Sequence, residues 1–185
     1  MNLKNVIVRV VVSILSIMSM NIDTPIPSGD WTLYWHSSEG NDWKSVHSFD
    51  NFGPMKTWGN FLNVMDSIGE STLSDGMFFL MRNPIPPLWE NHQNVYGGAY
   101  SLRIVKHDAG KVFIDYAIAA MNKLVTADSK NIINGLSISP KKGFNIIKLW
   151  NNDSTVYKNP TDLLKLIPDM KAEDILYTPF TSKKM

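Results

Sequence analysis

Short apolar and aromatic runs recur along this chain at the two-residue alternation of half-buried β-strands, and this pattern constrains the fold most. In one run Tyr100, Leu102 and Ile104 alternate with Ser101 and other neighbours of different character. Two later runs are separated by Pro-Lys-Lys-Gly, which favours a hairpin turn. The complete set of expected strands is residues 31–35, 43–49, 77–81, 100–106, 132–139, 145–150 and 175–177.

Longer segments carry apolar residues at the three- and four-residue spacing of a helix. The strongest covers residues 112–125, where Phe113, Tyr116 and Ala120 share one side. A second covers residues 54–65, and a short third is expected near the C-terminus. Several antiparallel strands with helices segregated between them predict an α+β fold. The third expected helix covers residues 161–167.

The size and composition narrow the class of protein. The chain has 185 residues, which suits one domain with one core. Its net charge of +1 gives no global basic field, so any nucleic-acid contact must be local. It has no cysteine, which excludes disulfides, thiol nucleophiles and Cys-type zinc sites and fits a reducing compartment. Its six tryptophans are many for this length, and Trp is the best side chain for stacking on a base or a cation.

The first residues form an apolar extension, so we divide the chain into an extension at 1–22 and one domain at 23–185. Lys4 and Arg9 followed by an apolar run resemble a signal peptide. The run is too short to span a bilayer, and its end makes a poor cleavage site. The alternative is an extension that packs on the domain or stays mobile.

A tryptophan and a glutamate lie next to each other on a loop stiffened by prolines, in the sequence PPLWEN at residues 86–91. An ionised Glu90 can accept both donors on the Watson–Crick edge of guanine. A guanine methylated at N7 is a cation, and such a ring gains cation–π energy against Trp89. Trp43, which follows a polar loop, is the candidate for a second plate. The alternative for each Trp is a place in the core.

Five landmarks in order resemble the translation initiation factor 4E family: WTLY from residue 31, Trp43, PLWE from 87, NVYGG from 94 and IIKLW from 146. That family has a Trp-x-Leu-Trp strand, a stacking Trp, a Pro-Met-Trp-Glu-Asp loop, an Asn-x-x-Gly-Gly turn and a late strand ending in Trp. The resemblance covers residues 25–177 at similar spacing. One landmark is weak evidence, but five in register are strong because their spacings are independent.

The resemblance implies that the protein binds the 7-methylguanosine cap of mRNA in support of translation initiation. It implies a curved antiparallel sheet with helices on the convex face and the cap slot on the concave side. Trp43 and Trp89 resemble the stacking plates, which we expect to face each other, and Glu90 resembles the guanine-reading carboxylate. Trp150 resembles the Trp that meets the methyl group. No cofactor, metal, membrane contact or enzymatic activity is expected, and the protein is expected to act as a cytoplasmic monomer.

The phosphate end of the site departs from the family. Lys141 falls where the family has a phosphate-binding Arg, and keeps the charge without the bidentate fork. Ile146 falls where the family has a Lys, and Ala99 where it has an Arg. Lys148 lies on the same strand face as Ile146 and Trp150, so we expect it to take over the triphosphate contact. Lys142 is a secondary candidate, with a solvated turn charge as its alternative.

The family also docks a short helix of scaffold factor 4G, or of proteins that mimic it, on its convex face. Pro25, within Thr-Pro-Ile, resembles the family's His-Pro-Leu segment weakly. Trp58 resembles an exposed Trp at a helix start. In a register shifted by one residue, Trp58 instead matches a buried Phe.

The sequence argues against an enzyme and leaves two other functions open. Glu90 and His92 imitate an acid–base pair, but no nucleophile or metal set accompanies them in the sequence. A cap-binding repressor that does not recruit the scaffold would use the same fold, and an exposed Trp58 would argue against it. A secreted or structural α+β domain without cap binding requires cleavage of the amino-terminal run.

Overall fold

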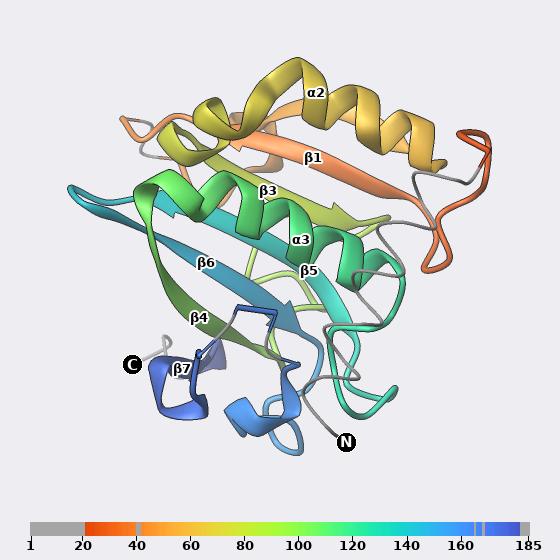
Figure 1. Cartoon of the computed structure of the whole chain (residues 1–185). Helices are drawn as coiled ribbons and strands as arrows, with labels where there is room; N and C mark the ends of the chain where they lie inside the picture. The colour runs from red at the N-terminus through yellow and green to blue at the C-terminus, as the bar shows by residue number, and fades with distance from the viewer. Residues whose placement is uncertain (1–20, 40–41, 165, 168, 182–185) are drawn as a thin grey trace.

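Seven antiparallel strands form one curved sheet in the order β2-β1-β3-β5-β6-β4-β7 (Figure 1). This computed structural model describes residues 21–39, 42–164, 166–167 and 169–181. The strands are β1 (Trp31–His36), β2 (Asp50–Met55), β3 (Met77–Arg82), β4 (Gly98–Val105), β5 (Ile133–Pro140), β6 (Phe144–Asn151) and β7 (Ile175–Pro179).

Two α-helices, α2 (Trp58–Asp75) and α3 (Ala109–Met121), lie side by side over one face of the sheet (Figure 1). A capping box begins α2, because the Thr57 hydroxyl accepts from the Asn60 N–H while the Asn60 side chain accepts from the Thr57 N–H. Gly69 interrupts α2 with a φ of 76°, a conformation that glycine adopts at little cost. The described part of the chain also has four short 3-10 helices: η1 (Val46–Ser48), η2 (Lys106–Asp108), η3 (Pro160–Asp162) and η4 (Ala172–Asp174).

Strand alternation divides the buried side chains into two clusters. The larger cluster fills the space between the sheet and the helices, and Leu149 on β6 belongs to it. The smaller cluster lies on the opposite face. We call this opposite side the aromatic face. The smaller cluster comprises Phe49, Phe79, Met81, Ile85, Ala99, Trp150 and Phe180.

The predicted α+β class is confirmed, but several expected elements shift. Residues 43–49 form no strand, because the Asp42 carboxylate accepts from the N–H groups of Lys44 and Ser45 and turns the chain into η1. The chain before α2 is also extended rather than helical, since Pro54 pairs with Thr32 across β1 and β2. The helix expected at 161–167 is wrong too. There Leu163 bridges Thr126 instead, and among the described residues of this stretch the helical structure is the 3-10 turn η3.

The chain segment before β1 packs against the start of α2. The Gly59 and Trp58 N–H groups donate to the carbonyls of Ile22 and Thr24, at 2.8 and 3.1 Å. The folded part therefore reaches back at least to Ile22. The apolar run and the cleavage-site hypothesis fall on residues 1–20, outside the described residues. Among the described helices, none is long and apolar enough to cross a membrane.

Candidate nucleic-acid interface

Aromatic rings form a connected line across the aromatic face. The ring centroids of Phe49 and Phe79 are 5.3 Å apart, those of Phe79 and Trp150 6.2 Å, and those of Trp150 and Phe180 5.0 Å. These spacings are typical of edge-on and tilted aromatic pairs. Trp150 is 6% exposed, and its indole N–H donates to the Ser137 hydroxyl at 3.2 Å. Phe49, Phe79, Trp150 and Phe180 therefore form a continuous layer of packed rings on this side of the sheet, which we call the aromatic floor.

Trp43 stands at the edge of this floor and is 38% exposed. Its indole stacks on the His36 ring, with centroids 3.8 Å apart and planes 24° apart, and meets Phe49 edge-on at 6.3 Å. Because a stacked neighbour covers one face of the indole, the exposed surface of Trp43 is available to a second ring. The chain thus holds Trp43 near the aromatic face without burying it.

His36 was not among the residues predicted from the sequence. It ends β1, is 1% exposed, and lies on the same strand face as Tyr34. Its Nδ1 lies 2.7 Å from the Ser37 carbonyl oxygen and its Nε2 3.4 Å from the Asp42 carbonyl oxygen. Contacts at both ends of the intervening loop make His36 the anchor of the segment that carries Trp43.

Trp89 is half-buried and packs against the same aromatic cluster, together with Leu88, while Glu90 beside it is exposed. The loop is held by the fully buried Asn94. The Asn94 amide donates to the carbonyls of Pro86 and Leu88, at 3.2 and 2.8 Å. These bonds fix the backbone on both sides of Leu88 and so the position of Trp89.

Asn94 is in turn held from the sheet, and this explains the first residue of the NVYGG motif. The Asn134 amide on β5 donates to the Asn94 side-chain oxygen at 3.1 Å and to the Gln93 carbonyl at 2.8 Å. A buried amide with its donors and acceptor all engaged specifies one loop conformation.

The two glycines that end the motif are required by close packing. A Cβ on Gly97 would collide with the Asn151 backbone carbonyl, and one on Gly98 with the Tyr177 hydroxyl. The Asn151 side-chain oxygen accepts from the Gly98 N–H at 3.1 Å and from the Tyr177 hydroxyl at 2.9 Å. Nearby, burial raises the pKa of Tyr100 to about 12, so this phenol stays a donor at neutral pH. It donates to a backbone carbonyl at 2.6 Å.

Of the predicted lysines, Lys148 lies on β6, whereas Lys141 and Lys142 lie in the turn before it. Lys148 is paired across the sheet with Ser101 on β4 and Ser137 on β5, on the same face as Trp150. The register between β4 and β6 is unbroken along this stretch, so no bulge turns Lys148 to the other face. Lys141 and Lys142 are exposed in the turn between β5 and β6, where the Lys141 N–H donates to the Phe144 carbonyl at 2.8 Å.

The three tryptophans predicted to contact the base, Trp43, Trp89 and Trp150, therefore gather on one face of the sheet. The model of the family described as eukaryotic initiation factor 4E matches residues 28–183. The chain belongs to this family. An initiation factor 4E homolog of Acanthamoeba polyphaga mimivirus is 26% identical over 102 residues, 54% of this chain and 34% of that protein. The Saccharomyces cerevisiae initiation factor 4E is 28% identical over 129 residues, 65% of this chain and 58% of that protein.

The aligned segments span a third of the viral relative and somewhat over half of the yeast one. A solved structure of C. elegans initiation factor 4E-3 with the 4E-binding protein Mextli and a cap analog has a TM-score of 0.62. It is 17% identical, and the match covers 71% of this chain and 76% of that one. This likeness supports the initiation factor 4E fold for the chain.

The predicted partner residues lie on the helix side, with different exposures. Pro25 is exposed and bridges Thr57 just before α2. The expectation of an exposed Trp58 is wrong, because its indole is 1% exposed and meets Phe61 edge-on at 6.0 Å in the core. The capping box places Trp58 at the first helical position, so the shifted register with a buried aromatic applies. Leu62 is instead 39% exposed.

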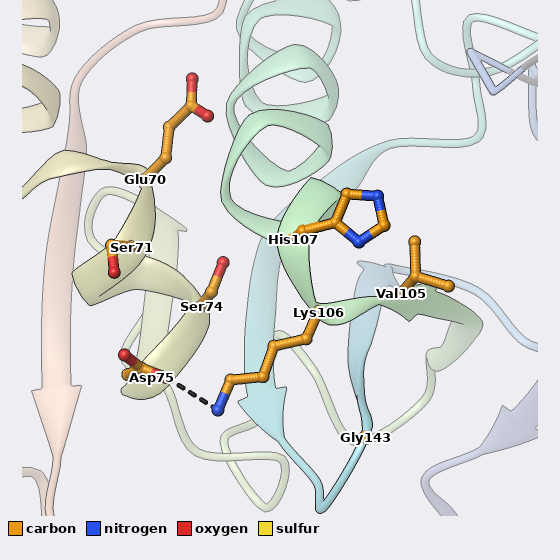
Figure 2. A pocket seen from close by; sticks show the side chains of 8 residues that line it. All are labelled: Glu70, Ser71, Ser74, Asp75, Val105, Lys106, His107 and Gly143. Carbon is orange, nitrogen blue, oxygen red and sulfur yellow. Dashed lines mark ion pairs between the residues drawn. The ribbon is translucent and has the colours of Figure 1, made fainter.

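A separate open pocket of about 790 Å³ lies where α2 ends and α3 begins (Figure 2). Lys106 reaches across it to Asp75, with a nitrogen–oxygen distance of 2.8 Å. Its lining carries both signs of charge and contains none of the residues predicted for cap binding. The lining residues are Glu70, Ser71, Ser74, Asp75, Val105, Lys106, His107 and Gly143. In the described part of the chain, no group of three or more acidic or histidine side chains could hold a metal ion.

Proposed function

We propose that the chain binds the 7-methylguanosine cap of mRNA and supports translation initiation. The observation that carries this proposal is the convergence of Trp43, Trp89 and Trp150 on one aromatic floor from three separate chain segments. Core tryptophans would be buried together on the helix side, as Trp58 is. A Trp that stays 38% exposed beside such a floor costs burial energy and suits a ligand platform.

The chemistry of the three residues matches a methylated guanine. The base would stack between the outer face of Trp43 and the indole of Trp89, with a cation–π gain that an unmethylated guanine lacks. Glu90, exposed beside Trp89, would accept the two donors of the Watson–Crick edge. Trp150 would offer the methyl group the part of its ring that the floor leaves accessible. This is binding chemistry, and we propose no catalytic activity.

For the triphosphate we propose Lys148 as the main contact, with Lys141 next and Lys142 secondary. Lys148 shares a strand face with Trp150 and lies two residues from it, which is about 7 Å along a strand. Each lysine acts as a flexible point charge and lacks the fork of an arginine. Binding should therefore weaken strongly with salt.

The partners follow from the same proposal: capped mRNA at the aromatic face, and a helix-docking protein such as scaffold factor 4G at the helix side. Pro25 and Leu62 are the exposed residues that such a helix would meet. We place the protein in the cytoplasm as a monomer, where initiation occurs.

The buried Trp58 favours a second candidate, a cap-binding repressor that does not recruit the scaffold. An excess of a 4E-binding helical peptide distinguishes the two. If the peptide binds and Leu62→Asp abolishes that binding, the result supports recruitment of the scaffold. If the peptide does not bind although the protein still binds 7-methyl-GTP, the result supports the repressor.

A direct test of cap binding is retention of the full chain on immobilised 7-methyl-GTP. The proposal predicts release by free 7-methyl-GTP and no release by the same concentration of GTP. Failure to be retained, or release by both nucleotides alike, would contradict it.

A further inference from the structure

We infer that the aromatic face holds a second RNA subsite, at Arg103 and Phe144, which receives the first transcribed nucleotide of a capped message. This inference rests on the proposed cap site, because the cap fixes where the RNA chain begins. Arg103 lies on β4 and Phe144 opens β6. The Arg103 guanidinium carbon lies 3.9 Å from the centroid of the Phe144 ring.

The pairing of β4 with β6 places this pair beyond Lys148 as seen from Trp150. Ala99 is opposite Trp150, Ser101 opposite Lys148, and Arg103 opposite Ile146. Successive partners on one face are separated by two residues, or about 7 Å. Trp150, Lys148 and Arg103 therefore follow one another in steps along the same face, in the order of base, phosphate and next nucleotide.

The Arg103 side chain is prepared for such a ligand. It is exposed, and among the residues that the structure describes no carboxylate forms an ion pair with it. Phe144 supports one side of the guanidinium, so little side-chain entropy remains to be lost on binding. The outer side offers a flat cation on which a base stacks, while the N–H groups at its edge point to phosphate oxygens.

The positive charge of this face favours binding of an anion. The aromatic-face positions of β4 and β6 include two cations and no carboxylate, and the turn beyond them adds Lys141 and Lys142. A cation row with an aromatic ring beneath it is the combination that binds single-stranded RNA. An acidic peptide would use the charge and gain nothing from the stacked pair, so we favour RNA. The positions are Ala99, Ser101, Arg103 and Val105 on β4, with Phe144, Ile146, Lys148 and Trp150 on β6.

The test compares 7-methyl-GTP with a short capped RNA oligonucleotide, titrated against the full chain and its Arg103→Ala variant. We expect the affinity of the variant for the capped RNA to fall about 5-fold or more, which corresponds to the lower end of the energy of one stacked base. Its affinity for 7-methyl-GTP should fall by less than about 2-fold. The plot of log affinity against log salt concentration should become shallower by about 0.7 for the capped RNA, because one phosphate contact is lost.

Two further variants separate charge from stacking and fold. Arg103→Lys should keep the salt slope but lose part of the affinity for capped RNA, because an ammonium offers no plane. Lys111→Ala removes one charge from α3, on the other side of the sheet, and should leave the affinity for both ligands unchanged. An equal loss for both ligands in Arg103→Ala, or a loss for neither, would overturn the subsite. Competition by poly-glutamate equal to that by uncapped RNA would do so too. A wild type that binds neither capped ligand would refute the cap site itself.

Discussion

The imidazole of His36 stacks on the indole of Trp43, with ring centroids 3.8 Å apart and planes 24° apart. A side chain at the end of a buried strand thus supports a residue of an exposed loop. The site therefore does not depend on the ligand alone to place Trp43. His36 also ties the loop to the sheet through its contacts with the Ser37 and Asp42 carbonyls.

Replacing His36 by alanine should weaken 7-methyl-GTP binding, although His36 itself would not contact the ligand. The lost aromatic pair is worth about 0.5–1.5 kcal/mol, and the freed loop adds an entropic cost on binding. His36→Phe keeps the stack but loses both contacts with the carbonyls of the loop, so its affinity should fall between those of the wild type and His36→Ala. The dissociation constants of the three proteins check this. Tighter binding by His36→Ala would mean that the imidazole blocks the indole face that the base needs.

Glu90→Gln should weaken 7-methyl-GTP binding by about 1–3 kcal/mol, because glutamine keeps one acceptor and turns an NH₂ group toward the guanine donors. Glu90 is exposed, so thermal unfolding should not change. Glu70→Gln, on the helix side, is the matched control and should bind as the wild type does. Isothermal titration with each protein gives the comparison, and equal affinities for both variants would remove Glu90 from the site.

Much of this architecture is predictable from the sequence where one pattern decides it. The strands β4, β5 and β6 follow from clean alternation and a Pro-Gly turn, and the structure has them. The strand β2 does not follow, because its sequence contains both Gly53 and Pro54 and its formation depends on pairing with β1. The position of Trp58 could not be predicted either, since a shift of one residue in its alignment with the family decides whether it is exposed or buried.

The site divides in the same way. The resemblance indicates the tryptophans and Glu90, because the family's landmarks are contiguous in sequence. It does not indicate His36 or Arg103, because each acquires its role from a residue brought close by folding, Trp43 and Phe144. Alternation along β4 could have placed Arg103 on the face of Trp150 once the pairing of β4 with β6 was known.

Asn94→Ala should loosen the loop that carries Trp89. The substitution removes the Asn94 bonds to the carbonyls of Pro86 and Leu88 and one of the two bonds that the Asn134 amide donates, at about 1–3 kcal/mol in the free energy of unfolding. Cap affinity should fall as well, since Trp89 must then be ordered on binding. Urea unfolding and a 7-methyl-GTP titration measure the two effects. Asn63→Ala, an exposed site on α2, should show neither.

Lys148→Ala should weaken binding of 7-methyl-GTP and leave the 7-methylguanosine nucleoside nearly unaffected, because only the first ligand carries phosphates. The plot of log affinity against log salt concentration should become shallower for the triphosphate. Titrations of both ligands at several salt concentrations provide the measurement. An equal loss for both would indicate damage to the strand, and no loss for either would place the phosphates elsewhere.

The most direct test of cap recognition is the quenching of tryptophan fluorescence by 7-methyl-GTP compared with GTP. The methyl group changes the charge of the base and little else, so the ratio of the two dissociation constants isolates the cation–π contribution. Our account predicts strong quenching and binding of 7-methyl-GTP about 10-fold or more tighter than GTP, from roughly 1.4 kcal/mol or more of added stacking. Equal affinity for the two nucleotides, or no quenching by either, would contradict it.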